Sequence, residues 1–344
     1  MTSFSKLTPR GAQRITVRDV ADKSGVSAST VSLVLAKKGN ISPDTRQRVL
    51  DVAAELGYTS RLRSDSILAM VGILIDDASN PYYSELLDGV RTVLDPLGFL
   101  PFVVAHDDDL QRQSVILSTL DRSKPAGLLI IPASGSSVDV LGHVSSLEVP
   151  FVVGIRHLGT GEYDYVGPSY FRGVQLAVSH LISLGHKRIA LAGGEKHNSA
   201  YRDRYSGYVS SLQLSGLSVD ENLVLHGPAT YKEGEVYAAS LMNRSDPPSA
   251  IIAYNDFVAL GVMHGLETLG FIPGRDVSVI GFDDVQAAAR DRIPLTTVST
   301  PPGRLGSELM RLLVGRMSDS GRAAVYLTPP PALVVRKSCG PKPE

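Results

Sequence analysis

Polar and aromatic side chains that could bind a small molecule follow several apolar runs of this 344-residue sequence. The segment Asp76 to Tyr83 comes directly after the run Val71–Ile75, and Arg156, Asn255 and Asp283 each stand just after a further run. Carboxylate and amide groups bind hydroxyls, while an aromatic ring can cover a sugar ring or a base. Ligands of α/β proteins bind at the carboxyl ends of the strands, so these residues predict a small-molecule crevice.

The same residue types also have a structural interpretation. Ser79 and Asn80 are good helix caps, and Pro81 is a favoured first helical residue. Asp256 would be costly in a buried position without a partner, and a helix N-cap could supply one. A lone arginine such as Arg204 is in most proteins a surface residue. A ligand-binding role and a purely structural role therefore both remain as interpretations of these residues.

Motifs for nucleotide-dependent or metal-dependent catalysis are missing from the sequence. Gly193-Gly194 follows an apolar run but lacks the G-x-G-x-x-G spacing of dinucleotide-binding turns, and no G-x-x-x-x-G-K-[ST] motif occurs. The eight histidines are dispersed without an H-E-x-x-H pair, and the one cysteine, Cys339, stands in a polar tail. We therefore expect no enzyme, no metal and no cofactor.

Short apolar runs separated by amphipathic stretches follow Ala69. Leu86, Val90, Val93 and Leu94 have the spacing of one helix face, which is typical of the segments between the runs. Alternation of strands and helices predicts a doubly wound α/β body. Seven runs are expected to form buried parallel strands: Val71–Ile75, Leu100–Val104, Gly127–Ile131, Phe151–Val153, Ile189–Leu191, Ala250–Ala253 and Val277–Ile280.

Two short helices joined by a glycine-containing turn are predicted near the N-terminus. Thr16 can cap a first helix that buries Val17, Val20 and Ala21, and Gly25 can end it. Ser27 then offers the cap of a second helix, whose inner residues are Val31, Val34 and Leu35. This pattern predicts a helix-turn-helix, with a plain three-helix bundle as the alternative.

A third helix is expected to begin at Ser42, with Pro43 in its first turn and Val49, Val52, Ala53 and Leu56 on its inner face. The second helix would then expose small and hydroxylated side chains near its N-terminus, which permits close approach to DNA. Hydroxyl groups suit phosphate oxygens, and apolar groups suit thymine methyls. These exposed side chains are Ala28, Ser29, Thr30, Ser32 and Leu33.

The net charge of −1 is divided unevenly along the chain. Residues 1 to 63 hold 11 Lys and Arg against 5 Asp and Glu, a net of +6, which leaves −7 for the rest. A basic head on an acidic body indicates that the head meets a polyanion, although a charge run alone is also typical of a solvated tail. The acidic body is expected to keep the protein from coating DNA indiscriminately.

Composition indicates a protein of the cytoplasm. The chain is 43% apolar and 20% charged, which is typical of a soluble globular protein. Its longest apolar runs, such as Ile67 to Ile75, fall far short of the ~20 residues that a bilayer requires. The polar N-terminus argues against secretion, and a single cysteine forms no internal disulfide.

Three N-terminal segments resemble the DNA-binding head of the lactose/galactose repressor (LacI/GalR) family. These are ITVRDVADKSGVSASTVS from Ile15 to Ser32, ISPDTRQRVL from Ile41, and Leu56-Gly57-Tyr58. Pro294 to Val298 and Leu333 to Cys339 also resemble family signatures, so the resemblance covers nearly the whole chain.

The resemblance implies an all-α helix-turn-helix head and an α/β body of two lobes with doubly wound parallel sheets, similar to the periplasmic sugar-binding proteins. The head is expected at residues 1–58, a short hinge or linker at 59–70, and an effector-binding and dimerisation body at 71–340. The chain is expected to cross between lobes near Val166, Ser299 and Leu327. Lobe 1 would comprise about 71–166 and 300–327, and lobe 2 about 167–299 and 328–340.

The family register also implies roles for individual residues. Asp283 matches the family's effector-binding acid, and Arg204 matches an arginine that reaches into the crevice. The residues expected at the effector are Asp77, Asn80, Tyr82, Tyr83, Arg156, Arg204, Asn255 and Asp283. The residues expected at DNA are Thr16, Ser27, Ala28, Ser29, Thr30, Ser32, Leu33, Asn40, Thr45, Tyr58 and Leu62.

Several positions depart from the family pattern. Leu33 and Ala36 stand where polar residues commonly read bases, which shifts the expected base contacts toward Ser29 and Asn40. The linker is about one helical turn shorter than in other members of the family. Two interpretations of it remain: a hinge helix that inserts Leu62 into the minor groove of DNA, and a plain flexible linker. In the crevice, Ile155, Ser169-Tyr170 and Ala229 replace acidic, amide or aromatic residues.

The combined expectation is a dimeric regulator, most simply a repressor, that binds double-stranded operator DNA. A carbohydrate-like molecule, such as a sugar, a sugar derivative or a nucleoside, would close the lobes and change the affinity for DNA. The alternative is a regulator of the same fold whose altered crevice needs no small molecule. A pure solute-binding protein would leave the head without a role, and a tetramer is disfavoured because no leucine heptads follow Cys339.

Overall fold

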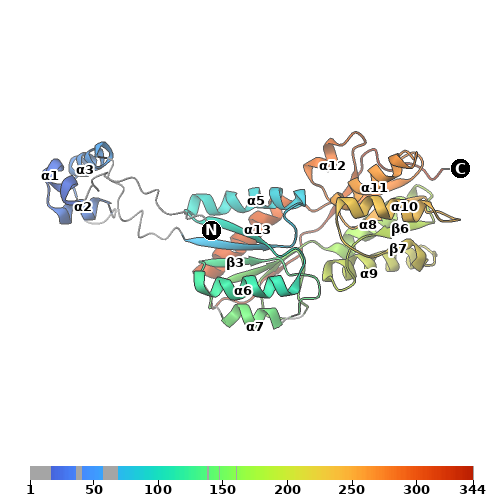
Figure 1. Cartoon of the computed structure of the whole chain (residues 1–344), viewed down its shortest axis with the longest axis horizontal. Helices are drawn as coiled ribbons and strands as arrows, with labels where there is room; N and C mark the ends of the chain where they lie inside the picture. Colours follow the sequence, from blue (N-terminus) through green and yellow to red (C-terminus); the bar gives the residue numbers. More distant parts are fainter. Residues whose placement is uncertain are drawn as a thin grey trace, which may run out of the picture. The chain divides into compact units, whose positions relative to one another are not determined.

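The computed structural model describes residues 17–35, 41–56, 69–137, 139–146, 148–159 and 161–343. They form two compact units that divide between residues 68 and 69 (Figure 1). No helix within these ranges has the length and apolar character needed to cross a membrane. The predicted positions Thr16, Asn40, Tyr58 and Leu62 lie outside the described residues.

The N-terminal unit is the predicted helix-turn-helix. It contains α1 (Val17–Ser24), α2 (Ala28–Leu35) and α3 (Pro43–Glu55). The Ser27 hydroxyl accepts the Thr30 backbone N–H at 3.1 Å and so caps α2, while Ser42 does the same for Thr45 at 3.3 Å. Val20, Ala21, Val31, Val34, Val49 and Ala53 form its buried core.

The first lobe of the body is built on a six-stranded, wholly parallel sheet. Helices α5 (Pro81–Leu94) and α13 (Pro302–Ser318) pack on one face of this sheet, and α6 (Leu110–Ser123) and α7 (Asp139–Ser146) cover the other (Figure 1). In sheet order the strands are β11 (Tyr326–Leu327), β5 (Tyr165–Val166), β4 (Phe151–Gly154), β3 (Gly127–Ile130), β1 (Met70–Ile75) and β2 (Leu100–Ala105).

The second lobe repeats this architecture. Its strands, in sheet order, are β12 (Ala332–Val334), β10 (Thr296–Ser299), β9 (Ser278–Asp283), β8 (Ala250–Ala253), β6 (Ile189–Ala192) and β7 (Val224–Leu225). All pairs are parallel except β10 with β12. Its helices are α8 (Tyr170–Ser183), α9 (Ser199–Leu214), α10 (Tyr231–Met242), α11 (Asp256–Thr268) and the short α12 (Gln286–Arg290).

All seven predicted strands form, but one is not buried as expected. Leu100 and Val103 of β2 are 46% and 41% exposed, because β2 lies at the edge of its sheet and is covered less than its neighbours. Three strands of two residues each, β5, β7 and β11, escaped prediction because such a length carries no pattern. The fold class predicted from the sequence is confirmed.

Prolines stand in all three segments where the chain passes between the lobes. The segment after β5 contains Pro168, the segment after β10 contains Pro301, and the segment after β11 contains Pro329–Pro331. Pro168, Pro301, Pro329 and Pro330 line one small pocket, so the three segments lie side by side. Each proline fixes one backbone torsion of its segment.

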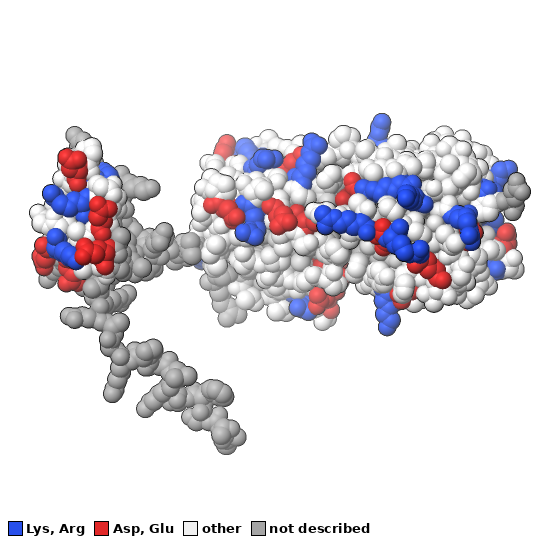
Figure 2. Space-filling view, turned by 90° about the horizontal axis from the view of Figure 1, so that it is seen from above, with Lys and Arg blue, Asp and Glu red and all other residues white. Residues whose placement is uncertain are grey.

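Charges of both signs are interspersed on the surface of the body. Figure 2 shows Lys and Arg beside Asp and Glu over the face turned toward the viewer. The net negative charge of the body is therefore not gathered into one patch on that face.

Helices α5 and α13 cross in backbone contact because small residues stand at the crossing. A Cβ atom added at Gly89 would lie 1.8 Å from the Gly303 carbonyl oxygen, and one added at Gly306 would lie 2.1 Å from the Leu86 carbonyl oxygen. The Ser307 hydroxyl donates to the Gly89 carbonyl at 3.0 Å. This contact joins two segments about two hundred residues apart in sequence and brings α13 onto the first sheet.

The Gly89→Ala substitution is expected to destabilise the body by about 3 kcal/mol, since the helices must separate to admit the methyl group. Gly142→Ala is the control, because Gly142 is an exposed position of α7 with open space at the Cβ position. That substitution is expected to stabilise by about 0.5 kcal/mol. Urea unfolding measures both, and equal free energies of unfolding for the two variants would contradict the packing described here.

Candidate functional site

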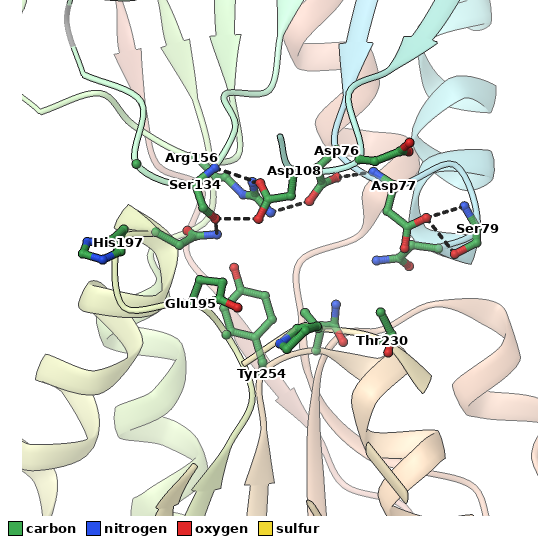
Figure 3. A pocket seen from close by; sticks show the side chains of 18 of the residues that line it. Asp76, Asp77, Ser79, Asp108, Ser134, Arg156, Glu195, His197, Thr230 and Tyr254 are labelled. Atoms are coloured by element: carbon green, nitrogen blue, oxygen red, sulfur yellow. Dashed lines mark hydrogen bonds and ion pairs between the residues drawn. The ribbon is translucent and has the colours of Figure 1, made fainter. Parts of the chain in front are cut away.

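A cavity of about 830 Å³ opens where the carboxyl ends of the strands of both lobes face each other (Figure 3). Loops that follow β1, β2, β3 and β4 line it from the first lobe, and loops that follow β6, β7 and β8 line it from the second. This is the crevice predicted at the strand ends. Most of the residues that line it have polar side chains, and they include Asp76, Asp77, Asn80, Asp108, Ser134, Arg156, Glu195, Asn198, Thr230, Tyr254 and Asn255.

Arg156 is the buried charge at the centre of the first lobe's wall. It is 7% exposed and forms ion pairs with Asp76 and, at 2.5 Å, with Asp108. Its guanidinium also donates to the Pro132 carbonyl oxygen at 3.0 Å. Burial opposes the charged form, but the two carboxylates outweigh this effect and raise the pKa of Arg156 well above its usual value.

Asp108 connects Arg156 to the second lobe through Ser134. Its two carboxylate oxygens accept the Ser134 backbone N–H at 2.8 Å and the Ser134 hydroxyl at 2.7 Å. Burial would raise the pKa of Asp108, but Arg156 and these hydrogen bonds lower it. The Asn198 amide of the second lobe donates to the Ser134 hydroxyl at 3.3 Å.

Hydrogen bonds and one His–Asp contact join the lobes on both sides of the cavity. The Gly135 N–H donates to the His197 carbonyl at 3.2 Å, next to the Ser134–Asn198 bond. His157 Nε2 lies 3.3 Å from Asp203 Oδ2, and the Gln286 N–H donates to the Glu85 carboxylate at 2.7 Å. A molecule bound in the cavity therefore contacts two lobes that already touch around it.

The capping interpretation is confirmed at Asn80, and Asn255 is a second helix cap that stands at the cavity. Asn80 is the N-cap of α5 and accepts the Tyr82 N–H at 3.0 Å, and Asn255 caps α11 by accepting the Val258 N–H at 2.9 Å. Both residues also line the cavity. Because the carbonyl oxygen of each amide serves the helix, its NH₂ group is the part left to meet a ligand.

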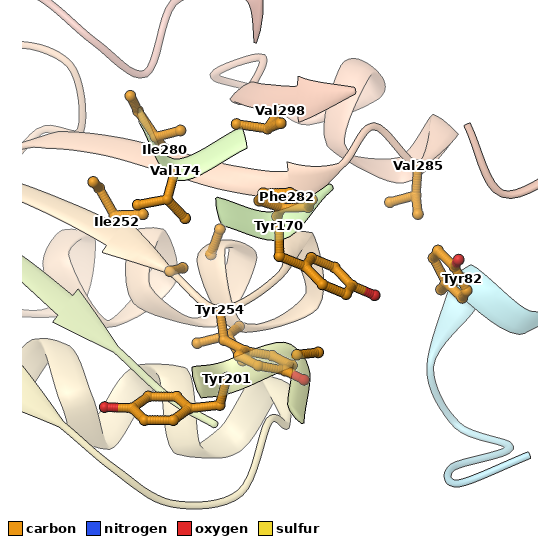
Figure 4. Close-up of a cluster of buried hydrophobic side chains, with 14 of the residues drawn as sticks. Tyr82, Tyr170, Val174, Tyr201, Ile252, Tyr254, Ile280, Phe282, Val285 and Val298 are labelled. Carbon is orange, nitrogen blue, oxygen red and sulfur yellow. The ribbon is translucent and has the colours of Figure 1, made fainter. Parts of the chain in front are cut away.

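A second pocket of about 40 Å³ adjoins the cavity on its inner side and shares five residues with it. The Arg204 guanidinium, 3% exposed, lies 3.9 Å from the ring centroid of Tyr170, 4.2 Å from that of Tyr254 and 4.4 Å from that of Phe282. Figure 4 shows Tyr82 of the first lobe facing these rings of the second. Tyr82, Tyr170 and Tyr254 line the inner pocket.

Polar atoms inside this inner pocket lack partners. Within the described part of the chain, Arg204 Nε and the Tyr82 hydroxyl have no hydrogen bond, and no hydrogen bond of the Asp283 side chain is found. Burial, followed by the neighbouring Asp256, raises the pKa of Asp283 well above its usual value. A buried donor and acceptor without partners are costly unless a bound group or water satisfies them.

Asp256 has partners that the sequence did not indicate. The N-cap of α11 is Asn255, and Asp256 follows it as a fully buried residue. Its carboxylate accepts the Thr297 hydroxyl at 2.6 Å and the Val285 N–H at 2.9 Å. Burial raises its pKa to about 7, although these hydrogen bonds oppose the shift. The expectation that a helix N-cap would partner Asp256 was wrong, because its side chain points to the neighbouring strands and away from the helix amides.

The eight residues expected at the effector lie at these two pockets. Asp77, Asn80, Arg156 and Asn255 line the cavity, whereas Tyr82, Tyr83, Arg204 and Asp283 line the inner pocket, together with Asn80, Arg156 and Asn255. The sequence prediction missed several lining residues: Asp108, Ser134, Glu195, Asn198, Thr230 and Tyr254. The run of three aspartates after the predicted strand Leu100–Val104 was a usable signal for Asp108, whereas Thr230 follows a strand too short to predict.

Of the five side chains expected to be exposed on the second helix, two are exposed, one is half-buried and two lie outside the described residues. Ala28 is exposed and Leu33 is 41% exposed, while Thr30 and Thr45 are half-buried. The hydroxyls of Ser27 and Thr30 lie 2.8 Å apart, and Ser42 donates to Thr45 at 2.8 Å, so these hydroxyls also serve the helix caps. The side chains of Ser29 and Ser32 lie outside the described residues.

Comparison with known proteins gives two domain matches. Residues 16–60 match "Bacterial regulatory proteins, lacI family", and residues 178–339 match the periplasmic binding protein-like domain. The chain is 31% identical over 335 residues to the HTH-type transcriptional regulator DegA of Bacillus subtilis (strain 168), which covers 95% of this chain and 99% of DegA.

Solved structures with the same organisation are also similar. A complex of the transcriptional regulator CelR with cellobiose has a TM-score of 0.71 at 29% identity and covers 94% of this chain and 100% of its own. The lac repressor dimer bound to operator and the anti-inducer ONPF has a TM-score of 0.83 at 24% identity, with coverage of 95% and 100%. At this sequence identity, the similarity to the lac repressor shows the fold alone.

Replacing Arg156 by leucine is expected to destabilise the body by about 3 kcal/mol, because two partly buried carboxylates then face each other without a cation. Arg112→Leu is the matched control, since the Arg112–Asp107 ion pair is exposed and its loss should cost under about 1 kcal/mol. Chemical unfolding of both variants is the measurement. Similar losses for the two arginines would show that the buried triad does not hold the crevice wall.

Proposed function

The chain belongs to the LacI family of bacterial regulatory proteins and is a DNA-binding transcriptional regulator, and we propose that a small molecule held between its two lobes controls its affinity for operator DNA. The observation that carries this proposal is the cavity of about 830 Å³, which is lined by polar side chains from both lobes and bounded by contacts between them. A ligand that contacts both lobes favours one lobe arrangement over another, which is the requirement for allosteric control.

We further propose that the protein is a repressor whose head, residues 1–58, binds one half of a two-fold symmetric operator. The basic charge of this segment favours a polyanion. In the helix-turn-helix, α2 is the helix expected to enter the major groove, with Ala28 and Leu33 facing base edges and Thr30 and Thr45 near phosphates. Residues 59–70 would then link the head to the body.

A homodimer is the expected form on DNA. Two copies are needed to place one head in each half-site. The β2 edge of the first lobe carries the exposed apolar side chains Leu100 and Val103, and Met70 and Leu97 nearby are also exposed. An uncovered apolar strand edge favours association with a second copy.

The effector is proposed to be carbohydrate-like. CelR is described in complex with cellobiose, and a LacI-family regulator from Enterococcus faecium, 27% identical with a TM-score of 0.71 over 79% of this chain, is described with bound ribose. The acceptors and amide donors of the cavity suit hydroxyl groups. Among the expected residues, Asn80, Arg156 and Asn255 would contact the ligand in the cavity, and Arg204 and Asp283 would meet a group that enters the inner pocket.

A regulator without a small-molecule effector is the second candidate. The observation that favours it is the inner pocket, whose free volume of about 40 Å³ is reduced by the surrounding tyrosine rings. Calorimetric titration with sugars, sugar phosphates and nucleosides separates the two candidates. Heat of binding together with a change in operator affinity supports effector control, and operator binding that no compound changes supports the second candidate.

Leu33→Ala is expected to weaken binding to a selected operator by about fivefold, because an apolar contact with a base is lost, while binding to random DNA stays the same. Leu50→Ala is the control, since Leu50 is 42% exposed on α3 and is not among the residues expected at DNA. Fluorescence anisotropy with a labelled operator obtained by in vitro selection measures both. An unchanged operator affinity for the Leu33 variant would contradict its contact with bases.

Tyr254→Phe is expected to raise the concentration of carbohydrate needed to change operator affinity by about tenfold, because it removes a hydroxyl that points into the cavity. Tyr205→Phe serves as control, since its hydroxyl donates to Glu221 at 2.6 Å and Tyr205 does not line the cavity. Both variants should bind operator equally well without carbohydrate. If both variants need the same carbohydrate concentration to change operator affinity, the Tyr254 hydroxyl does not contact the carbohydrate.

A further inference from the structure

The walls of the cavity carry a strong excess of acid. Arg156 is the one Lys or Arg side chain among the described lining residues. Five carboxylates line the same cavity: Asp76, Asp77, Asp107, Asp108 and Glu195. A ligand that bears a phosphate or carboxylate therefore enters a site whose lining charge has its own sign.

Arg156 is not available to an anionic ligand. Its guanidinium already meets the carboxylates of Asp76 and Asp108 and the carbonyl oxygen of Pro132. A phosphate would have to displace a partly buried carboxylate from this cation, and the displaced carboxylate would then lose its ion-pair partner. Such an exchange is unfavourable.

Two other carboxylates have no cation to neutralise them. Among the described residues, neither Asp77 nor Glu195 forms an ion pair, and they stand on opposite lobes, after β1 and after β6. Figure 3 shows both side chains at the cavity. One oxygen of Asp77 accepts from the N–H and hydroxyl of Ser79, each at 2.7 Å, which leaves its second oxygen for a ligand.

Hydrogen-bond donors line the same two walls as these acceptors. Tyr254 is 7% exposed, its hydroxyl points into the cavity, and no hydrogen bond of this hydroxyl is found within the described chain (Figure 3). The NH₂ groups of Asn80 and Asn255 add further donors. A sugar hydroxyl both donates and accepts, so it can satisfy the acids and these donors together, whereas a phosphate satisfies the donors alone.

The two pockets also constrain the size of the ligand. The inner pocket, about 40 Å³, has room for a single hydroxyl-bearing arm and not for a ring. The cavity, about 830 Å³, lies near the upper end of the ~300–1,000 Å³ range of small-molecule sites. A single sugar ring would leave most of this space to water, whereas two or more linked rings would fill more of it.

We propose that the effector is an uncharged oligosaccharide of at least two sugar rings, held in the cavity with one hydroxyl-bearing arm in the inner pocket. Sugars that carry a phosphate or a carboxylate group are excluded from this site. This rests on the proposed function, because it assigns a ligand class to the same cavity. The acidic lining that excludes anions also supplies the acceptors for sugar hydroxyls.

The test uses the full-length protein on an array of di- and trisaccharides, each present as the neutral, the phosphorylated and the uronic-acid form. Retention on at least one neutral oligosaccharide is expected, with binding to its phosphorylated form weaker by at least about a hundredfold in calorimetric titration. Retention on an acidic form with higher affinity than its neutral parent, or retention on none, would overturn the proposal.

A paired variant examines the cause of the discrimination. The double substitution Asp77→Asn with Glu195→Gln keeps the shape of both side chains, and it is expected to reduce the preference for the neutral form by about tenfold. Asp88→Asn with Glu148→Gln is the control, since both acids are exposed and neither lines the cavity. Equal preferences in the two double variants would overturn the electrostatic explanation.

Operator binding of the same preparations is measured by anisotropy. Loss of operator binding would contradict the regulator function itself, whereas normal operator binding with retention on no neutral oligosaccharide contradicts only the ligand class. The two failures are therefore distinguishable.

Discussion

The crevice depends on one guanidinium. Arg156 follows β4, Asp76 follows β1, Asp108 follows β2, and Pro132 follows β3, so a single side chain ties together the loops after four adjacent strands. Asp108 in turn orients Ser134, which reaches the second lobe through Asn198. The wall of the cavity and the contact between lobes thus share one buried cation, which is neutralised from within the protein. The rest of the polar lining consists of acids, amides, hydroxyls and one imidazole.

Buried acids also shape the second lobe. Asp256 lies behind the inner pocket and Asp283 lies in it, and burial raises the pKa of both. Asp283 has a φ of 120°, a conformation that side-chain-bearing residues rarely adopt, and Ile155 at the crevice has a φ of 66°. Both residues stand at the ends of strands, β4 and β9, and both line the inner pocket, so the strained backbone of the body is concentrated in part at this pocket.

The sequence was sufficient for the elements that have a long or specific pattern. The helix-turn-helix followed from caps at Ser27 and Ser42 and from the spacing of Val20, Val31 and Val49, and the buried strands followed from apolar runs. It was insufficient where the cause is tertiary. Strand β2 has the same apolar composition as its neighbours, and only its edge position exposes Leu100. Asp108 and Ser134 join the site because Arg156 and the opposite lobe meet them, and no local pattern carries that information.

The prolines of the three crossing segments have a mechanical consequence. Pro168, Pro301 and Pro329–Pro331 each have a fixed φ in segments that lie side by side, which limits the backbone rotations available where the lobes connect. The two lobes are then expected to move relative to each other as rigid bodies. Any rotation of one lobe against the other would turn the first lobe together with the end at which β1 begins.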